Sequence, residues 1–264
     1  MVISFRNGLR VAMGGIERKL SIMKKIQEEG KANIAELAEE YGVSVMTIRR
    51  DLAKFAKEGL ITLEYGGAVL NTGALFEYNM VMKQGECQEE KRRIARECVS
   101  YINDGDSIFL DAGTTICEIA RLIAGWKNLT VMTHSLMVAN VLSKNDSIDL
   151  VMCPGKFRAT SMAYMGQLTD DFVSSFRFDK LFLAVEGVHP EAGVSVPNLT
   201  DGITKKNLVK QAKNVICAAD SSKFGKSFYY CICGLEEIDM IITDTGLDLL
   251  QVRQYEGRTV LKTV

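Results

Sequence analysis

The sequence predicts two folded parts, a small winged helix-turn-helix followed by an α/β domain with a mainly parallel sheet. Three observations lead to this fold class. Two short helical patterns are separated by Gly42 and followed by a glycine-containing pair of strands over residues 60–69. From Glu89 onward, short apolar strands alternate with helical patterns, which is typical of parallel sheets. The chain of 264 residues is also long enough for one small and one medium domain.

The expected domain boundaries follow changes in this pattern. We expect the helix-turn-helix domain at residues 16–70, a linker at 71–88 and the α/β domain at 89–264. Residues 1–15 fit no helix or strand pattern, so we predict an N-terminal arm or a misassigned start, with Met13 as the alternative to Met1.

The first domain is predicted to contain three helices. The apolar positions of the first helix are Leu20, Met23 and Ile26, and those of the second are Ile34, Leu37, Ala38 and Tyr41. Gly42 ends the second helix, and the short gap to the third is the spacing of a helix-turn-helix. The third helix is expected to start after Ser44, whose hydroxyl can accept a hydrogen bond from a first-turn N–H group.

The third helix is predicted to have an apolar face and a basic face. The apolar positions recur at helical spacing and are Val45, Ile48, Leu52 and Phe55. At about 100° per residue, the opposite face carries Met46, Thr47, Arg50, Lys54 and Lys57, with Arg49 and Asp51 on the flanks. A helix that buries one side and presents Arg and Lys on the other fits the DNA major groove.

A β-hairpin is predicted after this helix. Gly59 is expected to end the helix, residues 60–63 to form a strand, and residues 65–69 to turn into a second strand. These features predict a winged helix-turn-helix that binds double-stranded DNA. The alternative is an ordinary helical hairpin with a solvated charged face. The turn glycine, the cap and the wing glycines together favour DNA binding.

The candidate DNA-contacting residues are Ser44, Met46, Thr47, Arg49, Arg50, Lys54 and Lys57. The net charge of the whole chain is −1, so the prediction depends on this basic helix face and not on the total charge. One winged helix contacts few bases, and we therefore expect a homo-oligomer, a dimer or tetramer, that binds an inverted repeat.

The second domain is predicted to alternate strands and helices. Strands are expected at residues 107–110, 129–132, 148–152, 180–185, 215–218 and 240–243, and helices near 94–102, 116–123, 136–142 and 205–213. In parallel sheets of this kind, ligands bind beyond the carboxyl ends of the strands. The loops after Leu110, Met132 and Val185 are therefore the candidate ligand-binding loops.

The loop from Asp111 to Thr115 is the first of these. Gly113 permits a close backbone approach, the hydroxyls of Thr114 and Thr115 can donate, and the N–H groups of the following helix can bind a phosphate. Because Asp111 is itself negative, we do not expect it to bind an anion directly, and it is predicted to orient the loop or to bind a hydroxyl group of the ligand. The simpler alternative is that Thr residues before a helix act only as N-caps.

Two further groups extend this candidate site. The loop Thr133-His134-Ser135 places small donors after the next strand, and Lys223 can add a positive charge. Each has a simpler explanation as well. Ser135 can be a plain N-cap, a single lysine is often solvated, and His134 can be a hydrogen-bonded loop residue without a ligand.

Several segments together resemble one known family. In the first domain these are residues 34–38, the run Val43 to Leu52 with its Thr-Ile-Arg-Arg-Asp-Leu sequence, Glu58-Gly59 and residues 66–68. In the second they are residues 111–115, 133–135, 193–199, 220–225 and 241–244. From about Glu17 to the end, the chain resembles the DeoR family of bacterial transcription regulators.

This resemblance implies an effector domain with the fold of ribose-5-phosphate isomerase and glucosamine-6-phosphate deaminase. It implies an oligomeric sensor of phosphorylated sugars that usually represses a sugar-catabolic operon. The residues that it assigns to the effector site are Asp111, Gly113, Thr114, Thr115, Thr133, His134, Ser135, Glu186 and Lys223. Glu186 stands where the family often has Asp.

Two functions from different classes remain open at this point. The first is a DNA-binding repressor controlled by a phosphorylated sugar, with no catalytic residues and no cofactor. The second is a sugar-phosphate isomerase or deaminase that carries a DNA-binding domain, with Glu186 and His134 as base and acid. A regulator needs both domains and is therefore favoured. A purely structural adaptor leaves the Arg face and the Gly-Thr-Thr loop unexplained.

The cysteine content and the lack of long apolar runs indicate where the protein is located and whether it binds zinc. The chain has seven cysteines, and Cys231 and Cys233 have no second matching pair, so we predict no zinc site. Reduced, mostly buried thiols in the cytoplasm are the expected state. No apolar run is long enough to span a membrane, and the N-terminus lacks the pattern of a signal peptide.

Overall fold

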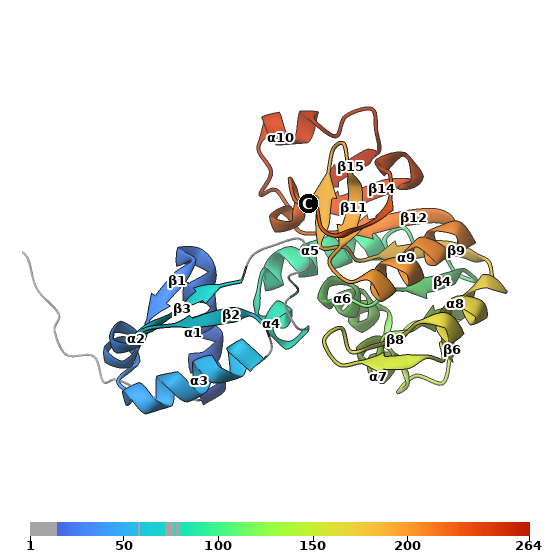
Figure 1. Ribbon diagram of the computed structural model, residues 1–264. Coiled ribbons are helices and arrows are strands. Elements are labelled where there is room, and N and C mark those ends of the chain that lie inside the picture. Colours follow the sequence, from blue (N-terminus) through green and yellow to red (C-terminus); the bar gives the residue numbers. More distant parts are fainter. Residues whose placement is uncertain (1–14, 58, 72–76, 78–79) are drawn as a thin grey trace, which may run out of the picture. The chain divides into compact units, whose positions relative to one another are not determined.

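A computed structural model describes residues 15–57, 59–71, 77 and 80–264 (Figure 1). The chain divides into two compact units, Met1–Thr72 and Gly73–Val264, and each is described by itself. The predicted N-terminal arm, apart from Gly15, lies outside the described residues, as do most of residues 72–79 of the predicted linker.

In its described residues, the first unit has three helices and a small antiparallel sheet in the order β1-β3-β2. Its elements are α1 (Gly15–Glu29), β1 (Lys31–Asn33), α2 (Ile34–Tyr41), α3 (Val45–Lys57), β2 (Ile61–Glu64) and β3 (Gly67–Leu70). The helices bury the predicted Met23, Ile26 and Leu37 and also Ile22. Strand β1 was not predicted, because three residues are too few to show an alternating pattern. Helices followed by a β-hairpin confirm the winged helix-turn-helix.

The turn between α2 and α3 has the conformation that the sequence predicts. Gly42 adopts the left-handed conformation with φ of 64°, and its N–H donates to the carbonyls of Ala38 and Glu39. Ser44 Oγ accepts the N–H of Thr47 at 3.2 Å, which confirms the predicted cap of α3. The two helices therefore meet at a turn fixed on both sides.

The buried face of α3 differs from the prediction at two positions. Ile48, Leu52 and Phe55 are buried as expected, whereas Val45 is 43% exposed. Asp51, expected on a flank, is buried instead. It accepts hydrogen bonds from Arg18 Nε at 2.9 Å and Arg18 Nη2 at 2.8 Å, which ties α3 to α1. The first turn of α3 thus projects beyond the core, and an ion pair completes the buried face.

Replacing Asp51 with alanine is expected to destabilise the first unit by about 3 kcal/mol, because the nearly buried Arg18 guanidinium loses its counter-charge. Hydrogen exchange of the α1 and α3 amides measures this as faster local opening. Lys57→Ala, an exposed change on the same helix, is the matched control. Equal protection of α3 in both variants would contradict the assigned role of Asp51.

The second unit is built on a seven-stranded sheet in the order β15-β14-β12-β9-β4-β5-β6, as far as the described residues extend (Figure 1). All neighbouring strands are parallel. The strands are β4 (Ser107–Leu110), β5 (Leu129–Thr133), β6 (Ile148–Met152), β9 (Phe178–Leu183), β12 (Ala212–Ala218), β14 (Met240–Thr243) and β15 (Val260–Thr263). This sheet confirms the predicted α/β class.

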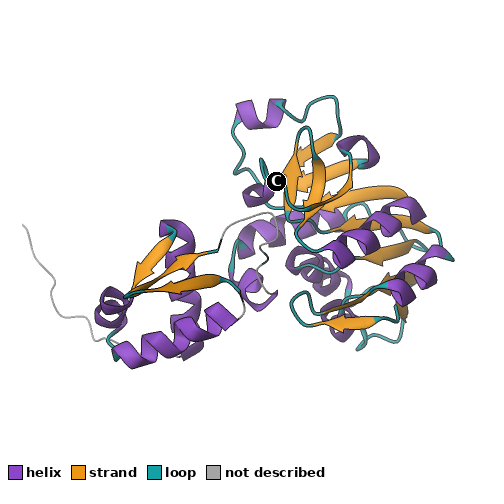
Figure 2. Cartoon of the chain, in the orientation of Figure 1, coloured by secondary structure: helices purple, strands orange, loops and turns teal. Residues whose placement is uncertain are grey.

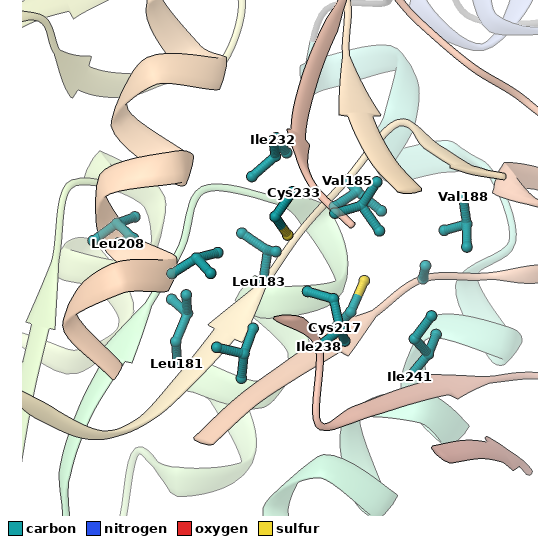
Figure 3. Packing of buried hydrophobic residues seen from close by; sticks show 14 of the residues in the cluster. Leu181, Leu183, Val185, Val188, Leu208, Cys217, Ile232, Cys233, Ile238 and Ile241 are labelled. Atoms are coloured by element: carbon teal, nitrogen blue, oxygen red, sulfur yellow. The ribbon is translucent and has the colours of Figure 1, made fainter. Parts of the chain in front are cut away.

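Helices cover both faces of the sheet (Figure 2). They are α5 (Gln88–Val99), α6 (Thr114–Ile123) and α7 (Leu136–Leu142) on one face and α8 (Gln167–Ser174) and α9 (Leu199–Gln211) on the other. Successive residues of β9 alternate between the two cores: Leu181 and Leu183 pack with Leu208 of α9, and Phe182 packs with the α5–α7 layer. Figure 3 shows Leu181, Leu183 and Leu208 in the first of these cores.

The chain order reverses between β4 and β9. From β4 the chain continues to β5 and β6 on one side, and β9, β12, β14 and β15 follow on the other. Such a reversal is a topological switch point, and it leaves a crevice at the carboxyl ends of the two strands. Asp111 and Ala184 directly follow these strands, so the crevice begins at those two residues.

The second unit also contains shorter elements that the sequence did not predict. They are α4 (Met80–Gly85), β7 (Lys156–Arg158), β8 (Ala163–Met165), β10 (Gly187–His189), β11 (Gly193–Val196), β13 (Tyr230–Cys233), the 3₁₀ turns η1 (Ser221–Lys223) and η2 (Leu235–Glu237), and α10 (Leu249–Arg253). Helix α4 and Gln88, the first residue of α5, occupy part of the segment expected as a linker. None of the helices in the described part of the chain could cross a membrane.

Candidate DNA-binding surface and ligand cavity

The exposed face of α3 carries most of the predicted DNA-contacting residues. Arg49, Arg50, Lys54 and Lys57 are exposed, as are Ser44 and Met46, while Thr47 is half-buried. Met46 is 61% exposed, which is unusual for a large apolar side chain. The face is therefore basic with an apolar patch at its N-terminal end, formed by Met46 and the unexpectedly exposed Val45.

The wing hairpin presents an aromatic residue at its tip. Tyr65 and Gly66 form the two-residue turn between β2 and β3, and Tyr65 is fully exposed. Gly66, the second residue of this turn, has φ of 79°, a left-handed conformation that glycine adopts without strain. A Cβ on Gly67 would lie 2.5 Å from the carbonyl oxygen of Ala32, so this glycine allows β1 to pair with β3. Tyr65 was not predicted as a DNA-contacting residue.

A cavity of about 50 Å³ lies at the switch point of the second unit. Its walls come from the ends of β4, β9 and β12, from α4 and the start of α5, from the β7–β8 hairpin and from the first turns of α9. Of the residues predicted for the effector site, Gly113, Thr114, Thr115, Glu186 and Lys223 line it. The carboxyl ends of three parallel strands thus meet at one polar cavity.

The N-terminus of α6 forms one wall of this cavity. Gly113 is the N-cap and supplies no side-chain hydrogen bond to the first N–H groups of the helix. Its φ of 177° is ordinary extended backbone, so conformation does not explain the glycine. A Cβ there would lie 2.6 Å from the Cβ of Ala184, so Gly113 is needed for close packing against the end of β9. The Thr114 and Thr115 side chains and the first N–H groups of α6 form this wall.

Two lysines in the cavity share one carboxylate. Glu186 pairs with Lys83 of α4, and its Oε2 accepts from Lys223 Nζ at 3.1 Å. Burial raises the pKa of Glu186, but the Lys223 and Lys83 ammonium groups outweigh this and lower it to about 2. The pKa of Lys223 is raised, because Glu186 and Asp220 outweigh the effect of burial. The carboxylate of Glu186 and the ammonium group of Lys223 therefore both stay charged at neutral pH.

Asp111 lies behind the cavity wall and joins four segments. Its Oδ1 accepts the N–H of Ala112 at 2.7 Å and lies 2.8 Å from His134 Nε2. Its Oδ2 accepts the N–H of Ala184 at 2.9 Å and Lys205 Nζ at 2.5 Å. Burial raises the pKa of Asp111, but Lys205 and His134 outweigh it and lower the pKa to about 2. A buried carboxylate thus holds β4 to β9 at the switch point.

Comparison with known proteins assigns the chain to a family. The model described as "DeoR C terminal sensor domain" matches residues 86–245, and that described as "DeoR-like helix-turn-helix domain" matches residues 18–74. The first alone covers more than half of the chain. The protein belongs to the DeoR family.

Curated relatives agree over nearly their whole length. The chain is 32% identical to the HTH-type transcriptional repressor GlcR of Bacillus subtilis, over 92% of this chain and 98% of that protein. It is 32% identical to the lactose phosphotransferase system repressor of Staphylococcus epidermidis, over 93% and 98%. It is 29% identical to the glycerol-3-phosphate regulon repressor of Escherichia coli, over 86% and 90%.

Among solved structures, ribose 5-phosphate isomerase A from Methanocaldococcus jannaschii is similar over 52% of this chain and 54% of its own, with 16% identity and a TM-score of 0.39. The fold assignment of this DeoR-family protein therefore rests on its own strand order and not on this likeness.

Three residues predicted for the effector site of this DeoR-family protein do not line the cavity. Thr133, His134 and Ser135 are fully buried. Thr133 Oγ1 donates to the carbonyl of Leu110 at 2.6 Å, and Ser135 Oγ accepts the N–H of Val138 at 3.3 Å as the N-cap of α7. Their loop follows β5, which lies on the far side of β4 from the switch point. In this loop Ser135 therefore acts as a helix cap and His134 as a hydrogen-bonded buried residue, which are the simpler alternatives given above.

Other residues of the cavity were not predicted. Lys83, Lys91, Ser161, Asp201 and Lys205 all line it. Lys205 is buried on α9 and donates to the carbonyl of Ala184 at 3.0 Å as well as to Asp111. A lysine within the predicted helix 205–213 was visible in the sequence, but nothing local marked it as buried. No cluster of three or more metal-ligating side chains occurs among the residues with described positions.

Proposed function

We propose that this DeoR-family protein represses a sugar-catabolic operon and that a phosphorylated sugar controls its binding to the operator. The observation that carries the proposal is the cavity at the switch point, where an uncapped helix N-terminus meets Lys223 in a chain that also presents the basic face of α3. The names of two relatives, a glycerol-3-phosphate regulon repressor and a lactose phosphotransferase system repressor, support it.

The phosphate binds at the N-terminus of α6. The free N–H groups and the helix dipole favour an anion there, and the hydroxyls of Thr114 and Thr115 add donors. Lys223 supplies a positive charge beside it. Asp111 has no direct part, because its oxygens are taken by backbone N–H groups, His134 and Lys205. It orients the loop.

Effector binding opens the cavity. A volume of about 50 Å³ is well below the roughly 300 Å³ or more of typical ligand pockets. Glu186 also forms ion pairs with Lys83 and Lys223, and these are two lysines that would otherwise attract an anionic ligand. A bound phosphate competes with Glu186 and shifts α4, the first described helix of the second unit. Because only a ligand that prefers one state shifts an equilibrium, this opening links effector binding to operator affinity.

The enzyme alternative is less well supported by the same residues. A general base or acid works best with a pKa near the operating pH, whereas two lysines hold the pKa of Glu186 at about 2 against the opposing effect of burial. His134, the other candidate, is fully buried against Asp111 and does not line the cavity. We therefore propose that the domain binds sugar phosphates without converting them.

The protein is further proposed to act as a dimer or tetramer on an inverted repeat of double-stranded DNA. One α3 helix reads only a few base pairs, and two-fold symmetry of the operator then mirrors that of the protein.

The proposal is tested by replacing Thr114 and Thr115 with alanine together. The variant should lose the rise in melting temperature that phosphorylated sugars give the wild-type protein, since ligands that bind only the folded state stabilise it. Operator binding without effector should be unchanged. Thr130→Ala, an exposed threonine on β5, is the control. A double variant that still responds at the same effector concentration would place the phosphate site elsewhere.

A further inference from the structure

Two polar atoms in the cavity wall lack a hydrogen-bond partner among the described residues. They are Asp201 Oδ1 and Ser161 Oγ, and both are shielded from solvent. Asp201 as a whole is only 7% exposed. Buried polar groups are normally hydrogen-bonded, because leaving one unpaired costs free energy. The two atoms lie in the wall that also contains Thr114 and Thr115, so a bound molecule can satisfy them.

Neighbouring cations do not satisfy Asp201. Lys205 Nζ lies 3.7 Å from Asp201 Oδ1, beyond hydrogen-bonding distance, because it donates to Asp111 and to the carbonyl of Ala184. Arg158 donates to both carboxylate oxygens of Glu77, at 2.9 and 2.6 Å. The charge of Asp201 is thus partly balanced by Lys205, while its oxygen still lacks a donor.

Both side chains are held by elements other than the α6 loop. Asp201 lies in the first turn of α9, where its N–H donates to Asn198 Oδ1 at 3.0 Å. Ser161 lies in the turn of the β7–β8 hairpin, and the adjacent Thr160 carbonyl accepts the N–H of Met80 of α4 at 2.9 Å. The unpartnered atoms therefore come from two separate elements, so a ligand has to reach both of them at once.

We propose that Asp201 and Ser161 select the effector by binding hydroxyl groups of its sugar portion, with Asp201 Oδ1 accepting one hydrogen bond and Ser161 Oγ making another. This rests on the proposed function, in which the α6 N-terminus holds the phosphate. A neutral hydroxyl fits better than an ammonium group, because Lys205 already faces Asp201 and Arg158 already pairs with Glu77. Phosphate then anchors the ligand and the hydroxyl contacts distinguish one sugar from another.

The test compares Asp201→Asn and Ser161→Ala with the wild-type full-length protein by calorimetric titration. The probes are inorganic phosphate, glycerol 3-phosphate, fructose 6-phosphate, glucose 6-phosphate and glucosamine 6-phosphate. The wild type should bind at least one hydroxylated sugar phosphate more tightly than inorganic phosphate. Each variant should weaken that binding by about 10- to 100-fold, the usual range for a hydrogen bond involving a charged or buried polar group, and leave inorganic phosphate unaffected.

Matched controls are Asp171→Asn and Ser174→Ala on α8, which do not line the cavity. Melting temperatures without ligand show whether each variant folds. Three results overturn the proposal: unchanged sugar-phosphate affinity in both variants, equal loss of sugar phosphate and inorganic phosphate, or a preference for glucosamine 6-phosphate over glucose 6-phosphate that Asp201→Asn removes. If the wild type binds neither inorganic phosphate nor any sugar phosphate, the proposed function itself fails, and this inference with it.

Discussion

Replacing Asp111 with alanine is expected to lower the free energy of unfolding of the α/β unit by about 3–5 kcal/mol. The change removes the nearer counter-charge of Lys205, which is 2% exposed, and leaves its buried ammonium group with Asp201 at 3.7 Å as the remaining carboxylate beside it in the described structure. It also leaves the N–H group of Ala184 without its side-chain acceptor and removes the nearer acceptor of the Ala112 N–H group. The effect is large because the Asp111 carboxylate accepts hydrogen bonds from all of these groups.

Urea unfolding followed by the fluorescence of Trp126 measures this loss. Trp126 is the only tryptophan of the chain and lies in the α/β unit, so its signal reports on that unit. Asp171→Ala, on the exposed side of α8, is the control and should change stability by less than about 0.5 kcal/mol. A loss at Asp111 no larger than that of the control would contradict the role assigned to this carboxylate.

The acid dependence of unfolding is a second readout of the same residue. The pKa of Asp111 in the folded protein is lowered from its usual 3.8 to about 2, since Lys205 and His134 outweigh the raising effect of burial. A lowered pKa means that the carboxylate stabilises the folded state above about pH 4 and loses this contribution as the pH falls toward 2. Asp111→Asn should flatten the stability profile in that interval.

The second large effect is expected at the recognition helix. Arg50→Ala should weaken operator binding by about 1–3 kcal/mol, and mainly at one base pair, if its exposed guanidinium reads a guanine. Lys54→Ala should weaken binding evenly across sequences and reduce the salt dependence by about one counterion, which is the expected result if its ammonium group contacts a phosphate. The two substitutions are therefore distinguished by their effects: Arg50→Ala changes sequence specificity, whereas Lys54→Ala changes salt dependence.

DNA selected in vitro by the wild-type protein supplies the operator for these measurements, made at several salt concentrations. Lys210→Ala on α9 removes the same charge from an exposed site in the other unit and serves as the control. Unchanged operator affinity in both α3 variants would refute the assignment of this face.

The predicted elements were most accurate where local patterns decide them. Strands β4 and β6 and helix α7 match the expected bounds, because each is a short apolar or periodic run between clear turn residues. The buried face of α3 was less predictable. Val45 lies in the first turn, outside the core, and the burial of Asp51 depends on Arg18, which is 33 residues away in sequence.

The candidate site was predicted in part for a similar reason. The loop after β4, which lines the cavity, was selected because its Gly-Thr-Thr sequence opens a helix. The loop after β5 was also selected but does not line the cavity, because alternating strands and helices do not reveal on which side of β4 the next strand lies. Lys205 and Asp111 are 94 residues apart, so no local pattern indicates that they pair. Strand order and long-range ion pairs required the three-dimensional structure.

Helix α4 has a practical consequence for building biosensors from this protein. Its Lys83 contributes to the cavity through Glu186, and the carbonyls of Lys83 and Glu86 both accept hydrogen bonds from Lys91 at 2.6 Å. A chimaera that joins a foreign DNA-binding domain at Gln88, where the long helix α5 begins, would discard a wall of the cavity. The fusion point that keeps the cavity whole is the division between Thr72 and Gly73.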